Sequence, residues 1–131
     1  MKALTICQPY ADLIAIGEKR VENRSWPTRY RGPIAVHAGK SRRWLVELSP
    51  PPEMVLGAVV AIAEIVDVLH IDEIMRGTHD QRHPWLRQHP HTEGDWCWVL
   101  DNVQRLASPI PCKGAQGLWN FAHENAIRKA S

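Results

Sequence analysis

Hydrophobic and polar residues alternate with the period of a β-strand in several separate stretches of the chain. Three short stretches are residues 2–6 (KALTI), 19–26 (KRVENRSW) and 32–39 (GPIAVHAG). Residues 56–69 (LGAVVAIAEIVDVL) are apolar almost throughout and predict a strand that crosses the core. Residues 96–106 (WCWVLDNVQRL), which follow a polar stretch, predict another strand. The pattern therefore predicts about five strands.

Helical spacing appears between these strands in shorter segments. Residues 8–17 (QPYADLIAIG) predict a helix, because a proline is tolerated in the first turn and Gly17 suits the position after the last one. Residues 41–48 (SRRWLVEL) and 71–75 (IDEIM) predict two more short helices, and residues 108–131 predict a glycine-bearing turn followed by a final helix.

Two polar stretches interrupt this pattern. Residues 48–53 (LSPPPE) predict a stiff surface loop, and residues 77–95, rich in His and Pro, predict a long irregular excursion. Strands and short helices in mixed order predict an α+β domain built around a small mixed β-barrel with short flanking helices. With 131 residues, we expect the whole range 1–131 to form a single domain, and a monomer.

Composition narrows the classes of protein that fit. Apolar residues make up 44% of the chain, but no apolar run approaches the roughly 20 residues of a membrane-spanning helix. The first ten residues lack the apolar core and cleavage site of a signal peptide, so we expect the cytoplasm. Cys7, Cys97 and Cys112 are odd in number and far apart, which predicts reduced thiols in packing roles.

Charge is distributed unevenly along the chain. Residues 1–44 carry nine Lys or Arg against three acids, residues 45–112 four against ten, and residues 113–131 three against one. Local potential rather than net charge attracts phosphate-bearing ligands. The basic first third therefore indicates an anionic partner, although a solvated basic face gives the same pattern.

The stretch 19–26 places unusual chemistry on a short strand. Its period of two puts Arg20, Glu22, Arg24 and Trp26 on one face, and Ser25 on the other. With Lys19 beside them, these residues offer a cation, a carboxylate, a guanidinium and a stacking plane, which are the groups that read a nucleotide. A Glu–Arg pair that only braces the sheet edge is the alternative.

Two further segments extend this candidate site. The Gln8 amide in the Gln8–Pro9 pair offers a donor and an acceptor to a base edge, or else forms a helix-capping turn. Lys40, Arg42 and Arg43 extend the positive surface towards a phosphate backbone.

Other chemistry has weaker support in the sequence. The histidines at 79, 83, 89 and 91 match none of the usual zinc spacings, so we expect no metal and no cofactor. No Ser or Cys stands in a nucleophile motif. Glu64 and Asp67 fall on opposite faces of their strand, and the sequence does not decide which one reaches a cleft.

The landmarks together carry a family resemblance. LTICQPYADLIAIGEKRVENRSW, RYRGPIAVHAGK, LGAVVAIAEIVDVL and PIPCKGAQGLW span nearly the whole chain. The pattern G-x-K-x-x-E-x-R-x-W, with Gly17 as its first residue, is the most specific of them. The sequence resembles the ASCH domain, a member of the PUA-like superfamily of small β-barrels. The resemblance implies a cleft beside the barrel that holds RNA or a modified base, with the 113–119 turn near it.

The resemblance leaves the function open among three classes. Binding of RNA or a modified nucleotide, with DNA as an alternative partner, is the leading expectation. Some bacterial ASCH proteins are amidohydrolases of acylated cytidine and others have ribonuclease activity, which here would use Lys19 and Glu22 as catalytic residues. Those amidohydrolases carry a threonine where this chain has Glu22, so the nucleophile position differs. A protein-interaction module is the third class.

Overall fold

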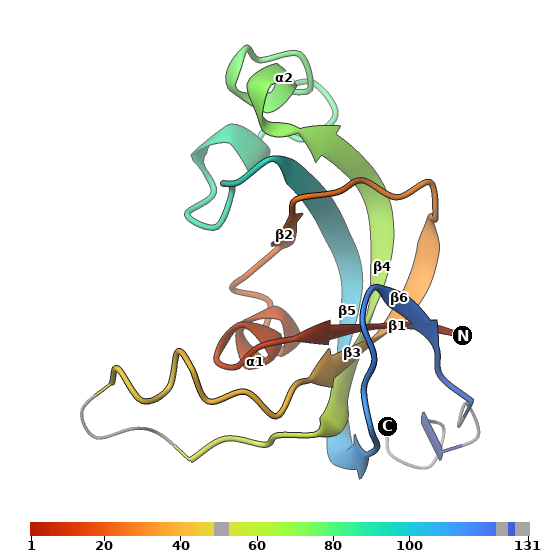
Figure 1. The fold of residues 1–131 in the computed structure, drawn as a ribbon. Coiled ribbons are helices and arrows are strands. Elements are labelled where there is room, and N and C mark those ends of the chain that lie inside the picture. The colour runs from red at the N-terminus through yellow and green to blue at the C-terminus, as the bar shows by residue number, and fades with distance from the viewer. Residues whose placement is uncertain (49–52, 123–125, 128–131) are drawn as a thin grey trace.

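A computed structural model describes residues 1–48, 53–122 and 126–127. Its centre is one curled sheet of six strands in the order β2-β5-β4-β3-β1-β6 (Figure 1). The strands are β1 (Lys2–Ile6), β2 (Val21–Arg24), β3 (Gly32–Ala38), β4 (Ala58–His70), β5 (Trp96–Pro111) and β6 (Leu118–Asn120). The α+β prediction is confirmed, with six strands rather than about five. The sixth, β6, is only three residues long and lies in a segment that the sequence assigns to a turn.

Strand direction in the sheet determines which ends meet. β1 pairs with β3 in parallel, whereas the β3–β4 and β4–β5 pairs are antiparallel. The connection from β1 to β3 is long enough for this crossover because it contains α1 (Tyr10–Ala15) and β2. The carboxyl ends of β1 and β3 therefore lie at the same edge of the sheet, where Thr5 is in register with His37.

The first helix follows the sequence prediction closely. α1 begins after Pro9 and ends near Gly17, whose φ of 84° is left-handed and favours glycine. α2 (Ile71–Met75) also forms as predicted. The prediction of a helix over 41–48 is wrong: residues 43–47 form turns, anchored by the buried Leu45. The final helix predicted near the C-terminus falls largely outside the described residues.

The core lies inside the curl of the sheet. Trp98, Leu100, Leu4, Ile14 and Ile65 are buried there with the apolar face of α1. β5 is longer than predicted, because Ile110 and Pro111 still pair with β4 after a series of register shifts. These irregularities increase the bend of the long β4–β5 ribbon. No helix of the described residues is long and apolar enough to span a membrane.

The 77–95 excursion covers the end of that ribbon. It consists of turns and a 3-10 helix, η1 (Leu86–Gln88), and its Leu86 is buried among residues of β2, β4 and β5. Arg20 lies over the ring of Trp85, with 3.7 Å between its guanidinium carbon and the ring centroid. The excursion is therefore irregular, as predicted, and is held against the strand that carries the candidate site.

Candidate functional site

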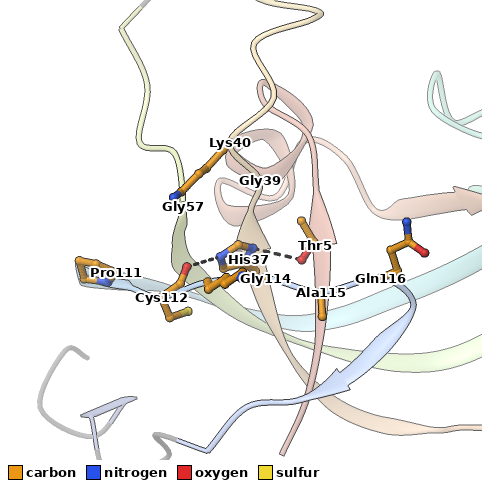
Figure 2. A pocket seen from close by; sticks show the side chains of 11 residues that line it. Thr5, His37, Gly39, Lys40, Gly57, Pro111, Cys112, Gly114, Ala115 and Gln116 are labelled. Carbon is orange, nitrogen blue, oxygen red and sulfur yellow. Dashed lines mark hydrogen bonds between the residues drawn. The ribbon is translucent and has the colours of Figure 1, made fainter.

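Three adjoining pockets meet at Thr5, near the carboxyl end of β1. We name them by a residue in each: the Lys19 pocket of about 340 Å³, the Trp26 pocket of about 590 Å³ and the His37 pocket of about 960 Å³. Thr5 lines all three, and Arg24 lines the first two. The His37 pocket is shown in Figure 2. Because they share lining residues, we name the three adjoining pockets together the Thr5 groove.

A carboxylate shared by two cations forms the polar side of the Lys19 pocket. Glu22 Oε1 lies 3.4 Å from Lys19 Nζ, and Glu22 Oε2 accepts a 2.9 Å hydrogen bond from Arg24 Nη2. Strand periodicity in β2 places Glu22 and Arg24 on one face, as the sequence predicts. Since two positive groups share one negative group, the trio carries a net charge of +1.

Lys19 is more buried, and makes more contacts within the protein, than the sequence indicates. The side chain is almost fully buried, and Nζ donates to the carbonyl of Val21 as well as contacting Glu22. Lys19 therefore has two partners within the protein. Burial lowers the pKa of the Lys19 amine, and the attraction of Glu22 opposes that shift only in part.

Arg24 retains donors that are not used within the protein. Its Nη2 donates to the carbonyl of Thr5 at 2.8 Å and to Glu22. Its Nε is the only buried side-chain nitrogen or oxygen without a hydrogen-bond partner among the described residues. Buried donors are normally paired, and this Nε is itself shielded, so an acceptor in the groove reaches it only if neighbouring atoms move.

Aromatic rings form the other side of the Lys19 pocket. Tyr10 comes from α1, Trp44 from the 41–48 turns and His91 from the 77–95 excursion. The Tyr10 ring meets Trp44 and His91 edge-on, with centroid distances of 6.3 and 6.4 Å. The sequence did not reveal this wall, because its three members come from separate segments with no common periodicity.

Trp26 occupies a different place from the one expected. It packs edge-on against Trp98 at 4.9 Å between centroids and lines the neighbouring Trp26 pocket with Gln116. It does not line the Lys19 pocket. Ser25 is exposed in the bend after β2 and lines none of the three pockets.

Gln8 is a structural residue rather than part of the groove. It is fully buried, and its Nε2 donates to Asp12 Oδ1 at 2.8 Å and to the Val55 carbonyl at 2.9 Å. Its Oε1 accepts from the Asp12 backbone N–H, so both ends of the amide are used at the start of α1. Of the two roles that the sequence leaves open for Gln8, these contacts match the helix-capping one, and Gln8 lines none of the three pockets. Pro9 stands at the N-cap of the same helix.

The three predicted basic residues after β3 are all exposed but lie in different places. Lys40 lines the His37 pocket. Arg43 lies 4.8 Å from the Trp44 ring centroid, and therefore beside the aromatic wall. Arg42 lines none of the three pockets; its carbonyl accepts bonds from Leu45 and Val46 in the turn.

The 111–117 loop closes the far side of the groove, near the cleft as expected. His37 Nε2 lies 2.8 Å from the Cys112 carbonyl, and His37 Nδ1 lies 3.1 Å from Thr5 Oγ1 (Figure 2). Trp119 Nε1 donates to the same Thr5 hydroxyl at 3.1 Å. Trp119 is partly buried, packing on His37 and Phe121, in agreement with a core role.

The acidic residues of β4 serve other contacts. Asp67 is buried and pairs with Arg82 at 2.8 Å and His83 at 3.0 Å, which fixes the excursion to β4. Glu64 accepts a 2.7 Å bond from Asn102. Neither lines the Thr5 groove. Among the described residues, no group of three or more His, Cys, Asp or Glu side chains is arranged to hold a metal ion.

Comparison with known proteins identifies this arrangement. The sequence profile of the ASCH domain matches residues 4–110, which include the three central strands and the whole ionic trio. The chain belongs to the ASCH domain family. Its α+β fold is accordingly the PUA-like fold that the resemblance implied.

Individual relatives are distant. This ASCH protein is 24% identical over 133 aligned positions to activating signal cointegrator 1 from Mus musculus and, equally, from Homo sapiens. The match covers 90% of this chain but only 22% of each of those proteins. The crystal structure of ASCH from Zymomonas mobilis is similar, with a TM-score of 0.59 at 15% identity, covering 98% of this chain and 92% of that one. This likeness concerns the fold.

Proposed function

We propose that this ASCH domain binds RNA or a modified nucleotide, with one nucleotide in the Lys19 pocket. The observation that carries the proposal is the pairing of two unlike walls in one pocket. Lys19 and Arg24 place two cations in one wall, which Glu22 and Glu93 of the same pocket balance in formal charge, and Tyr10 and Trp44 give the other wall ring faces and edges. A nucleotide combines an anion with a flat aromatic base.

The size and the free donors of the pocket support this ligand class. A volume of about 340 Å³ lies at the lower end of the range for small-molecule sites, about 300–1,000 Å³, and suits a single nucleotide. The Arg24 side chain is 23% exposed, so the accessible part of its guanidinium can donate to a phosphate oxygen or a base acceptor. Stacking of a splayed base on an aromatic side chain contributes about 1–3 kcal/mol.

Glu22 fits recognition better than proton transfer. Its Oε1 accepts from the Asn23 backbone N–H at 3.2 Å and contacts Lys19, while its Oε2 accepts from Arg24. Both carboxylate oxygens are therefore already engaged by donors of the protein. The role that follows for Glu22 is to hold both cations at the floor of the pocket.

Titration of mononucleotides tests the proposal directly. Isothermal calorimetry on the wild type and on Arg24→Gln, with cytidine and adenosine 5′-monophosphates as probes, is expected to show an affinity loss of about tenfold or more in the variant. Arg29→Gln is the matched control, because Arg29 is exposed between β2 and β3 and lines none of the three pockets. Equal affinities in the two variants would disprove binding at this pocket.

Hydrolysis is the second candidate, favoured by the lowered pKa of Lys19 beside a carboxylate. A buried amine of lowered pKa can exchange a proton with a reacting group. The experiment is incubation with N4-acylated cytidine and with RNA, followed by chromatography of the products. Glu22→Gln keeps the shape of the side chain but removes the charge. Retained nucleotide binding with lost turnover would assign an enzyme, whereas parallel loss of affinity without any product would assign recognition.

A further inference from the structure

The groove continues well beyond the pocket assigned to one nucleotide. From the Lys19 pocket it passes Arg24 into the Trp26 pocket, and from there past Ala115 and Gln116 into the His37 pocket. Figure 2 shows Lys40 and Gln116, which both line the His37 pocket, on opposite sides of Thr5 and His37. A ligand of one nucleotide leaves most of this groove unoccupied.

The His37 pocket carries cations at its rim and small or apolar groups in its lining. Lys40 and Lys113 supply the charge, and Pro111, Cys112 and Ala115 supply much of the apolar surface. No acidic side chain of the described residues forms an ion pair with either lysine. Two unpaired cations beside an apolar hollow match a phosphate next to a base.

The position of Lys40 is fixed by packing rather than by a partner. Its alkyl chain lies across Gly57, where an added Cβ would come within 3.0 Å of Lys40 Cε. Gly57 has a φ of 67°, so a glycine suits both the backbone conformation and this close approach. The lysine chain is thereby laid along the pocket wall, and its amine is presented at the rim (Figure 2).

We propose that the Thr5 groove binds a single strand of nucleic acid, whose neighbouring nucleotide enters the His37 pocket with its phosphate at Lys40 and Lys113. This inference rests on the proposed function, because the first nucleotide of the strand is the one in the Lys19 pocket. A single strand fits because its unstacked bases can enter pockets lined by rings and apolar groups, whereas the bases of a duplex are enclosed. The excess of cations in residues 1–44 agrees with a polyanion.

The experiment compares one nucleotide with a strand in the same protein. Competition fluorescence anisotropy with an unstructured pyrimidine oligomer of about six nucleotides is expected to show at least about tenfold tighter binding than the mononucleotide. Lys40→Glu/Lys113→Glu is expected to remove this gain and to leave mononucleotide affinity unchanged. Between about 50 and 200 mM salt, the slope of log K against log salt should become shallower by about 1.4, or 0.7 for each lost contact.

Arg29→Glu/Arg76→Glu is the matched control. It makes the same change in charge at two exposed positions, the second of them at the end of α2, which lies away from β1 in Figure 1. An oligomer that binds no more tightly than the mononucleotide would overturn the proposal, as would equal losses in the test and control variants. A duplex that binds as tightly as the single strand would also overturn it.

The two proposals fail in different ways. If the strand proposal alone is wrong, mononucleotide binding still depends on Arg24, but the affinity for the oligomer does not depend on Lys40 and Lys113. If the proposed function is wrong, the mononucleotide does not bind at Arg24, and the strand proposal falls with it. The titrations are carried out separately with RNA and DNA oligomers of the same sequence. Their affinities show whether the bound strand is RNA or DNA.

Discussion

The hydroxyl of Thr5 lies 3.1 Å from Nδ1 of His37, in a pair of residues that are in register on parallel strands. His37 Nε2 is 2.8 Å from the Cys112 carbonyl, and an imidazole nitrogen can meet a carbonyl oxygen at that distance only as a donor. In neutral His37, Nδ1 is then the acceptor and Thr5 donates to it. This contact connects β1, β3 and the 111–117 loop where the three pockets meet.

Gly114→Ala is expected to destabilise the protein at this contact. A Cβ at Gly114 would lie 2.6 Å from Thr5 Oγ1 and 2.7 Å from His37 Cε1, so the loop or the pair must move. Overpacking of this kind costs about 1–3 kcal/mol. Urea unfolding measures the loss, and Ala115→Ser, at an exposed neighbour in the same loop, is the control. Equal stabilities would show that the loop adjusts freely.

Lys19→Met is expected to lower both stability and nucleotide affinity. The Val21 carbonyl loses its donor and Glu22 loses one of its two cations, which together cost about 1–3 kcal/mol of folding free energy. The surface variant Lys40→Met should stay within about 0.5 kcal/mol of the wild type. Thermal melts and calorimetric titrations measure the two effects. Unchanged binding in folded Lys19→Met would mean that the trio only braces the sheet edge.

Trp44→Ala is expected to reduce nucleotide binding, whereas Trp26→Ala is expected to reduce the stability of the fold. Trp44 is 37% exposed in the Lys19 pocket, so its loss should reduce nucleotide binding by about 1–3 kcal/mol and leave the fold nearly unchanged. Trp26 packs against Trp98 and is half-buried, so its truncation should cost stability at the lower end of about 3–5 kcal/mol. Melting curves and nucleotide titrations of both variants decide which tryptophan stacks on the base.

Stability is expected to fall as the pH is lowered through the ordinary His89 pKa of 6.5. Burial lowers the pKa of His89 in the folded protein, helped by the nearby charges of His91, Arg20 and Lys19. The unfolded chain therefore takes up the proton first as the pH falls, and protonation favours unfolding. Protonation also removes the acceptor for the Arg20 backbone N–H.

Urea unfolding at pH 7.5 and at pH 5.5 measures this effect of acid. His89→Gln keeps an acceptor but does not titrate, so the loss of stability between the two pH values should be smaller in this variant. An identical loss in both proteins would assign the acid sensitivity to other groups.

The thiols are expected to react in the order of their exposure. Cys7 lines the Lys19 pocket, whereas Cys97 is fully buried and its Sγ lies 3.4 Å from the Glu93 carbonyl. Burial raises the pKa of Cys97, which further reduces the reactive thiolate. Iodoacetamide labelling followed by peptide mass spectrometry should modify Cys7 well before Cys97, and a bound nucleotide should protect Cys7. Faster labelling of Cys97 would contradict this structure of the pocket.

The sheet and the ionic trio were accessible to sequence reasoning because each depends on local periodicity. Alternation fixes which residues of β2 share a face, and the long apolar run of β4 has no other stable place than the core. The trio was therefore predicted with its correct members. The helix predicted over 41–48 was wrong. Leu45 is the one buried residue among these eight, so the segment has no apolar face to pack as a helix, and it forms turns.

The aromatic wall and the role of Gln8 could not be predicted in the same way. Gln8 is bonded to Asp12 four positions later, but also to the carbonyl of Val55, and that contact depends on the folded chain. Tyr10, Trp44 and His91 converge only after α1, the turns and the excursion have packed. Trp26 was assigned to the wrong pocket because strand periodicity stops at Arg24, where β2 ends.

The pairing of β1 with both β3 and β6 has a consequence for the order of events during synthesis. Lys2 is in register with Asn120, so the first strand acquires its second neighbour only when residue 120 has left the ribosome. Contacts between such distant segments form late, because the entropy of closing a long loop opposes them. The Thr5 groove also needs the 111–117 loop, which arrives at the same stage. A nascent chain that stops before this loop can build β3 and β4 but cannot yet complete the Trp26 and His37 pockets.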